Sequence, residues 1–193
     1  MSQVRSNLEI FENEISKEIE RILYKPDLRK DIQFIFSVKS KKNKNEEVRF
    51  LSSVIKKTAE RNKVWASLTK GDIISGDTVF NSIYVEIIEM NTKYQGFEVN
   101  KFLGSKLVKR SLNSLMKVSI YGNKYDYTST DIINVNYNDR VELDDIDNIE
   151  SEDYYFTQAE PPQISVWEEI VFPVTIIAAT IAAALLFFAI RSK

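Results

Sequence analysis

The 193-residue chain contains no cysteine and no histidine, and it has only five glycines and four prolines. Without cysteine it has no disulfide scaffold, no thiolate metal site and no cysteine nucleophile. Without histidine it lacks the commonest general base and zinc ligand, which excludes Ser-His-Asp and Cys-His catalysis within the chain. The glycines form no phosphate-binding loop of either standard kind. We therefore predict that the protein is not an enzyme and uses no metal or cofactor.

Charge is unevenly placed along the chain, although the formal net charge is only −2. Residues 1–140 carry a balance of +6, whereas residues 141–169 contain ten acidic residues and neither Lys nor Arg. This contrast predicts a mildly basic head followed by an acidic spacer. The expected organisation is an α+β head domain over 1–140, an acidic tether over 141–169, a transmembrane helix over 170–190 and a short cationic tail over 191–193.

The membrane prediction rests on residues 170–190, IVFPVTIIAATIAAALLFFAI, which contain no charge. A helix of this length spans ~31 Å, close to the hydrocarbon thickness of a bilayer. The run therefore predicts a single transmembrane helix with the lipid bilayer as its partner. The expected anchor residues are Trp167, Ile170, Pro173, Ile190, Arg191 and Lys193. Ala179 and Ala183 have the small-x-x-x-small spacing that lets helices pack closely, which predicts homo-oligomers through this helix.

The expected topology has two alternatives. Cations flank only the C-terminal side of the apolar run, which favours an extracytoplasmic head with the C-terminus in the cytoplasm. The N-terminal residues, however, contain no apolar leader of the kind that export requires. An extracytoplasmic head therefore needs a leader that lies upstream or has been removed. The other alternative is a tail-anchored protein with a cytosolic head.

The head has the patterns of an α+β domain. Apolar residues spaced three and four apart predict helices over 3–24 and 46–62. Alternating apolar and β-branched residues predict strands, with a hairpin turn at 121–124 and a short acidic helical turn over 144–150. The expected strands are 31–39, 64–68, 78–90, 106–120 and 125–137. We expect the two N-terminal helices to pack on one face of a mostly antiparallel sheet.

Three further groups of residues have the chemistry of binding or catalytic sites. Four lysines between the first strand and the second helix are suited to an anionic surface, although a solvated connection explains them better. Acidic residues of the tether and of the strands lack the spacing of a calcium loop or of a catalytic carboxylate pair. The third group, Tyr154, Tyr155 and Phe156, is predicted to contact a partner or to dock on the head or the membrane interface.

The C-terminal region resembles a known family. The residues that carry the resemblance are Tyr154 to Pro162, which contain an F-T-x-x-x-x-P stretch, with Trp167, Pro173 and the closing Arg191-Ser192-Lys193. They resemble an uncharacterised family of small bacterial envelope proteins with one C-terminal membrane helix. The resemblance implies an envelope location and no particular activity. Members of that family usually begin with a signal peptide, which this sequence lacks, so the topology stays open.

Together these observations predict a membrane-anchored, non-enzymatic binding or assembly module of the bacterial cell envelope, with a protein partner. The alternative is a tail-anchored cytosolic adaptor whose basic head binds anionic lipid or nucleic acid. Nucleic acid is the less favoured partner, because the lysine loop has no interleaved aromatic residue.

Overall fold

The computed structural model describes residues 4–26, 28, 31–69, 80–99, 106–121, 128–163 and 172–191. The chain divides into two compact units, Met1–Pro161 and Pro162–Lys193. The first unit contains the sheet and three α-helices, and the second contains one helix. The elements in chain order are α1 (Asn7–Leu23), β1 (Gln33–Ser40), α2 (Asn45–Arg61), β2 (Ala66–Thr69), β3 (Phe80–Val99), β4 (Lys106–Tyr121), β5 (Thr128–Glu142), the 3-10 turn η2 (Leu143–Asp145), α3 (Ile146–Ile149), the 3-10 turn η3 (Tyr155–Thr157) and α4 (Phe172–Arg191).

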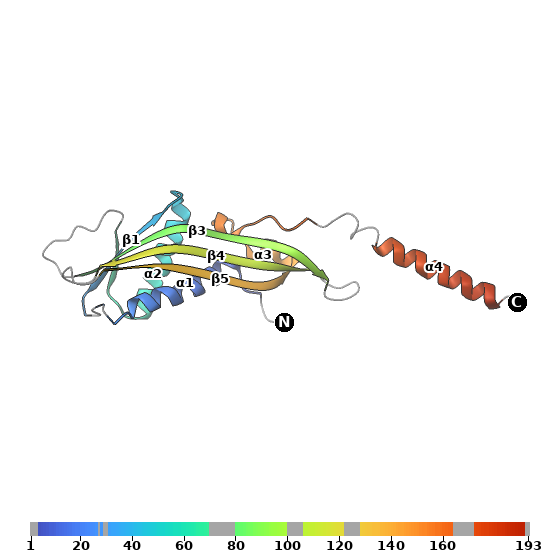
Figure 1. The fold of residues 1–193 in the computed structure, drawn as a ribbon, viewed down its shortest axis with the longest axis horizontal. Helices are drawn as coiled ribbons and strands as arrows, with labels where there is room; N and C mark the ends of the chain where they lie inside the picture. Colours follow the sequence, from blue (N-terminus) through green and yellow to red (C-terminus); the bar gives the residue numbers. More distant parts are fainter. Residues whose placement is uncertain are drawn as a thin grey trace. The chain divides into compact units, whose positions relative to one another are not determined.

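Both long helices of the first unit match the predicted apolar periodicity to within a few residues. Helix α1 begins at a capping box, in which the Ser6 hydroxyl accepts from the Glu9 N–H and the Glu9 carboxylate accepts from the Ser6 N–H. Such a cap satisfies backbone donors that the first helical turn would otherwise leave unpaired. Helix α2 packs beside α1 through polar contacts, with Lys57 bonded to Glu12 and Arg61 to Glu20. Figure 1 shows both helices on one side of the sheet.

The sheet has five strands in the order β2-β1-β3-β4-β5. Strand β1 pairs in parallel with both β2 and β3, whereas β3, β4 and β5 form an antiparallel meander. The α+β class is confirmed, but the expectation of a mostly antiparallel sheet is corrected to a mixed one. The physical reason is the order β1-α2-β2, since a helical connection returns the chain to the same end and the two strands then run parallel.

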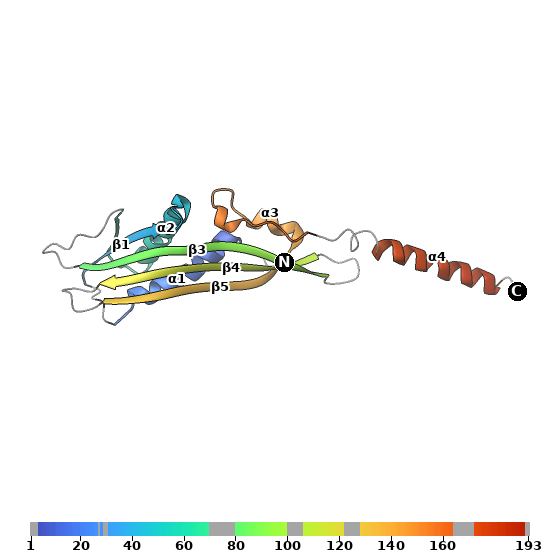
Figure 2. The ribbon, with the colours of Figure 1, turned by 45° about the horizontal axis from the view of Figure 1, so that its top comes forward.

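Strand β3 is longer than its predicted counterpart, since it continues from 91 to 99 through a polar stretch. Alternating burial in β4 shows which face meets the helices, because every second residue from Val108 to Ile120 is buried. The intervening β4 residues lie on the opposite face, which no described helix of the first unit covers (Figure 2). Residues 122–124 of the predicted hairpin turn lie outside the described residues.

Two apolar clusters lie on the helix-covered face. The larger cluster joins α1, α2 and all three long strands, with Phe11, Phe34 and Leu51 fully buried. The smaller cluster lies toward the end where β5 leaves the sheet. Its members are Tyr94, Val108, Val141, Ile146 and Ile149. Burial of both clusters removes apolar surface from water, which is the main favourable contribution to folding.

The second unit contains helix α4, which covers most of the segment that we expected to cross a membrane. Within the residues that the structure describes, no helix is both long and apolar enough to span a bilayer. This finding overturns the transmembrane part of the fold prediction, the single-pass topology and the predicted membrane location.

Candidate functional site

A buried polar network joins the start of α1 to the sheet and to the chain that follows β5. Arg110 on β4 is only 1% exposed, and its guanidinium donates to both carboxylate oxygens of Asp139 at 2.8 and 2.5 Å. Its remaining terminal nitrogen donates to the Asn7 carbonyl oxygen at 2.9 Å and to the Arg5 backbone oxygen at 2.9 Å. The Nε and one terminal nitrogen of Arg110 thus bond the two Asp139 oxygens side by side, in the bidentate geometry that makes arginine–carboxylate pairs strong.

Asn7 connects this ion pair to the C-terminal part of the unit. Its side chain is fully buried, and its amide nitrogen donates to the Tyr94 hydroxyl at 2.8 Å and to the Thr157 backbone oxygen at 2.7 Å. We call Asn7, Tyr94, Arg110, Asp139 and Thr157 the polar latch. Because its members hydrogen-bond one another in the interior, the latch positions three separate parts of the chain and is not itself open to a ligand.

Two groups at the latch have shifted pKa values. Burial raises the pKa of Tyr94 well above its ordinary value. Burial also raises the pKa of the Glu150 carboxyl, although hydrogen bonds from the Ala159 N–H and from Tyr94 oppose the shift. Both shifts follow from the cost of holding a charge away from water. The Glu150 carboxylate holds the segment 150–159 through the hydrogen bond that it accepts from the Ala159 N–H. Neither Tyr94 nor Glu150 lines the two hollows described below.

The aromatic residues that we predicted to dock or bind a partner divide into two kinds. Phe156 is 2% exposed and contacts Phe11 and Phe50, at ring-centroid distances of 5.2 and 5.0 Å. Tyr154 packs on Phe50 at 5.7 Å, whereas Tyr155 is 70% exposed. The cluster therefore docks on the head through Phe156 and Tyr154. Residues 143–161, which we expected in the tether, lie within the first compact unit.

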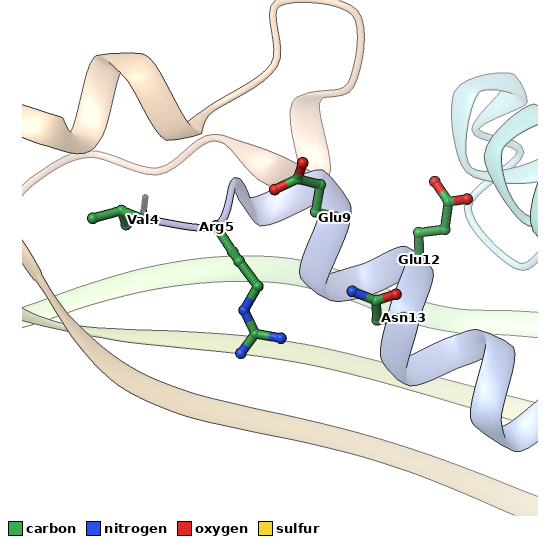
Figure 3. Close-up of a pocket in the computed structure, with 5 residues that line it drawn as sticks. All are labelled: Val4, Arg5, Glu9, Glu12 and Asn13. Carbon is green, nitrogen blue, oxygen red and sulfur yellow. The ribbon is translucent and has the colours of Figure 1, made fainter. Parts of the chain in front are cut away.

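A hollow of about 450 Å³ lies beside the N-terminal half of α1 (Figure 3). Figure 3 shows the Arg5 side chain extending away from the helix toward the sheet. Its guanidinium donates to the Tyr137 hydroxyl at 2.8 Å and lies 5.4 Å from the ring centroid. Glu9 belongs to the capping box and Glu12 is bonded to Lys57. The charged lining is therefore engaged in internal contacts.

A second hollow of about 310 Å³ lies on the face of the β3–β4–β5 sheet that the helices leave uncovered. It is lined chiefly by uncharged amides, with one acidic and one basic side chain. The lining residues are Glu89, Asn91, Lys93, Asn113, Leu115, Asn134 and Asn136. Glu89 was considered as one member of a carboxylate pair, and the other lining residues belonged to no predicted site. The signal that sequence analysis could have used is the recurrence of asparagine at alternate positions of β5, namely Asn134, Asn136 and Asn138, in a strand that otherwise has strong β-forming residues.

The outer edge of β5 is a third feature that is open to a partner. Strand β5 stands last in the sheet order, and its pairing with β4 runs from Thr128 to Glu142 without a register shift. At the opposite end of the sheet, the edge strand β2 has only four residues. Ile132 on β5 is 59% exposed. A long regular edge strand presents a row of backbone donors and acceptors to a partner strand.

The other predicted site residues are dispersed. Pro173, Ile190 and Arg191 belong to α4, and Ala179 and Ala183 are exposed on it. Trp167, Ile170 and Lys193 lie outside the described residues. The lysine loop provides the residue before α2, Lys44, whose ammonium lies 3.7 Å from Glu47. Glu86, Glu89 and Glu98 occupy different positions along β3, and no group of three potential metal ligands forms among the described residues.

Comparisons with known proteins give weak structural similarity only. No protein-family model matches the sequence, and no curated protein matches it. Two solved structures are similar in part. A neuraminyllactose-binding hemagglutinin homolog from Helicobacter pylori is 9% identical and has a TM-score of 0.38, over 63% of this chain and 72% of that chain. A minor lipoprotein from Acinetobacter baumannii is 12% identical and has a TM-score of 0.32, over 61% of this chain and 69% of that chain. The resemblance to a family of envelope proteins stays a prediction.

Proposed function

We propose that the first unit is a non-enzymatic binding module that takes up an extended segment of a protein partner along the outer edge of β5. The observation that carries the proposal is the length and regularity of this edge. Strand β5 spans 15 residues, and in the described chain no other strand pairs with its outer side. Addition of a partner strand to such an edge is a common mode of peptide recognition.

The two edges of the sheet differ in how they are protected. Proteins usually protect an edge strand by making it short, by bending it with a bulge or by placing proline in it. Strand β2 follows the first rule, because it has four residues. Strand β5 follows none of these three rules, since it is long, has no register shift and contains no proline, although it carries the charged side chains Asp131, Asp139 and Arg140, which also protect edges. This asymmetry supports β5 rather than β2 as the site of strand addition.

The non-enzymatic part of the proposal rests on the composition of the chain and on the use of its buried ionisable groups. The sequence offers no histidine and no cysteine. Arg110 and Asp139 are bonded to each other, and Glu150 accepts from the Ala159 N–H. Groups that serve catalysis are usually held at a cleft with a shifted pKa, whereas these groups bind parts of the same chain together.

Site-specific photo-crosslinking tests the proposal. A photoreactive amino acid replaces Ile132 on β5, and the matched control replaces Leu68, which is 42% exposed on β2. In cells that produce the full chain, we expect position 132 to form one predominant protein adduct. Mass spectrometry of the adduct should place the crosslink in an extended segment of the partner. The control position should give no such adduct.

The outcome against the proposal is equally specific. If positions 132 and 68 give the same adducts, or if neither gives any, β5 is not a preferred docking edge. Turnover of a substrate by the purified chain, abolished by replacement of a carboxylate with its amide, would contradict the non-enzymatic assignment.

A further inference from the structure

Asparagines gather on the uncovered sheet face, next to the β5 edge discussed above. Asn91, Asn113 and Asn136 are cross-strand partners on β3, β4 and β5. Asn134 and Asn138 lie two residues to either side of Asn136 on the same face of β5, and both are exposed. We call these five residues the asparagine row. Adjacent strands lie ~4.8 Å apart, so the row presents a nearly flat array of closely spaced amides.

Sheet stability does not explain this array. Asparagine is depleted in strands, where β-branched and aromatic residues fit the pleated surface better. The covered face of the same strands follows the rule, with Val118, Ile120 and Ile133 among its buried residues. Departures from local preference that the fold does not need are expected at functional positions. On the covered face of these strands Asn81 is the buried asparagine, whereas on the uncovered face five asparagines lie around the hollow of about 310 Å³.

Hydrogen bonds within the row fix how its amides point. The Asn138 amide nitrogen donates to the Asn136 carbonyl oxygen at 2.7 Å, and the Asn91 amide nitrogen donates to Glu89 at 2.7 Å. The Asn113 amide nitrogen donates to the Asn91 carbonyl oxygen and to the Ser111 hydroxyl, at 3.4 Å each. A side-chain amide has two N–H donors and an oxygen with two lone pairs. Each of these bonds uses one donor and one lone pair. The bonds therefore orient the groups and leave both donors and acceptors available to a ligand.

The charges around the hollow indicate which class of ligand it can bind. Glu89 and Lys93 lie on β3 on either side of Asn91, and they have opposite signs. The surface between them is formed by neutral amides and by the half-buried side chain of Leu115. Such a surface attracts neither a polyanion nor a polycation strongly. It fits a neutral ligand that offers hydroxyl donors and acceptors around an apolar face.

From this combination we infer that the asparagine row binds a neutral oligosaccharide. A sugar ring presents hydroxyls at its rim, which match the donor–acceptor pairs of the amides, and C–H groups on its face, which match Leu115. The site is shallow, so a chain of several sugars makes more contacts than a single sugar. The asparagine row lies on the face of the sheet, whereas the proposed protein-docking site is the backbone edge of β5 beside it. The two proposals depend on different groups, so one can be wrong while the other is right.

Nuclear magnetic resonance titration of the full chain tests the inference, with maltohexaose and chitohexaose as probes. Side-chain amide signals of the five asparagines report directly on the site. We expect one of the two probes to shift these signals. The affinity should fall by at least about tenfold in the double variant N113T/N136T, which is equivalent to ~1.4 kcal/mol. Threonine suits the strand better than asparagine, so the thermal midpoint should not fall.

A matched variant and a change of salt complete the test. Ser119→Thr alters the same face of β4 beside Thr130, away from the asparagine row. This variant should leave the affinity within about twofold of that of the original chain, whereas the double variant should lose about tenfold. Because the ligand is neutral, the affinity should not change when the salt concentration is raised, whereas an ionic contact would be screened. The inference is overturned if neither probe shifts the amide signals, if the double variant binds as tightly as the original chain, or if the row contacts a protein instead.

Discussion

The two faces of the β3–β4–β5 sheet belong to the same strands but carry different kinds of side chain. On the covered face, Leu112, Met116 and Val118 are fully buried, and the one charged side chain of β4 there, Arg110, has hydrogen-bond partners on every nitrogen. On the uncovered face, the same strands carry asparagines that strand preference disfavours. The covered face accounts for the stability of the unit. The uncovered face carries side chains that do not favour the strand conformation, and we propose that they serve binding.

The largest effect is expected at the polar latch. Arg110→Met should destabilise the fold by about 3–5 kcal/mol, because it leaves the Asp139 carboxylate partly buried without its cation. Chemical denaturation of the full chain measures the loss. The double variant R110M/D139L removes both charges and should recover more than half of it. A loss below about 1 kcal/mol for Arg110→Met would show that the covered face does not depend on the latch.

Replacement of Phe156 tests whether the segment after β5 packs stably on the covered face. Phe156→Ala should cost about 3 kcal/mol, since the ring is buried against Phe11 and Phe50. Hydrogen exchange should show lost protection at the Thr157 N–H, which is bonded to the Tyr154 carbonyl. Tyr155→Ala is the neighbouring control and should change stability little, because that ring is 70% exposed. Equal losses for the two variants would contradict the docking of this segment through Phe156.

A smaller effect concerns pH. Burial raises the pKa of Glu150 in the folded state above its ordinary value of 4.5. The folded state therefore holds this proton more tightly than the unfolded state. Its stabilising contribution is complete below pH 4.5 and is lost as pH rises through the folded-state pKa. Glu150→Gln keeps an acceptor for the Ala159 N–H and removes the titration.

Thermal unfolding of both chains across acidic and neutral pH checks this prediction. The difference in melting temperature should favour the glutamine variant at neutral pH and shrink on acidification. A constant difference would show that Glu150 does not titrate differently in the two states.

The smallest effect on stability is expected on the uncovered face. Asn113→Thr should leave the free energy of unfolding unchanged or raise it by a few tenths of a kcal/mol, because threonine is the better strand residue. Denaturant midpoints of the single variant and the original chain make the comparison. A clear loss of stability would mean that the asparagine row supports the fold, and the contrast between the two faces would disappear.

Sequence patterns predicted the elements whose periodicity is strong and local. Helix α1, helix α2 and strand β4 fall within a few residues of the predicted ranges, because their buried faces are marked by regularly spaced apolar residues. The second half of β3 was missed, since residues 91–99 have polar side chains on both sides of the strand. The parallel pairing of β1 with β2 was also missed, although the strand-helix-strand order was visible.

The candidate site was harder to predict than the fold. The polar latch joins Asn7, Arg110 and Asp139, and no local pattern links residues so far apart in sequence. The asparagine row depends on register, because Asn91, Asn113 and Asn136 become neighbours only when three strands are aligned. The aromatic cluster was recognised, but its partners Phe11 and Phe50 on the two helices were not. The transmembrane prediction followed the length and apolarity of residues 170–190 and the residues that flank them.

The hydrogen bond between the Asn7 amide and the Thr157 carbonyl also bears on how the protein is made. These residues are 150 positions apart, so the ribosome delivers Asn7 long before Thr157. During translation, the Asn7 amide and the Phe11 ring lack the contacts that they make with Thr157 and Phe156 in the folded protein. A nascent chain halted before Thr157 should therefore be sensitive to protease around α1, and release of a few more residues should end that sensitivity.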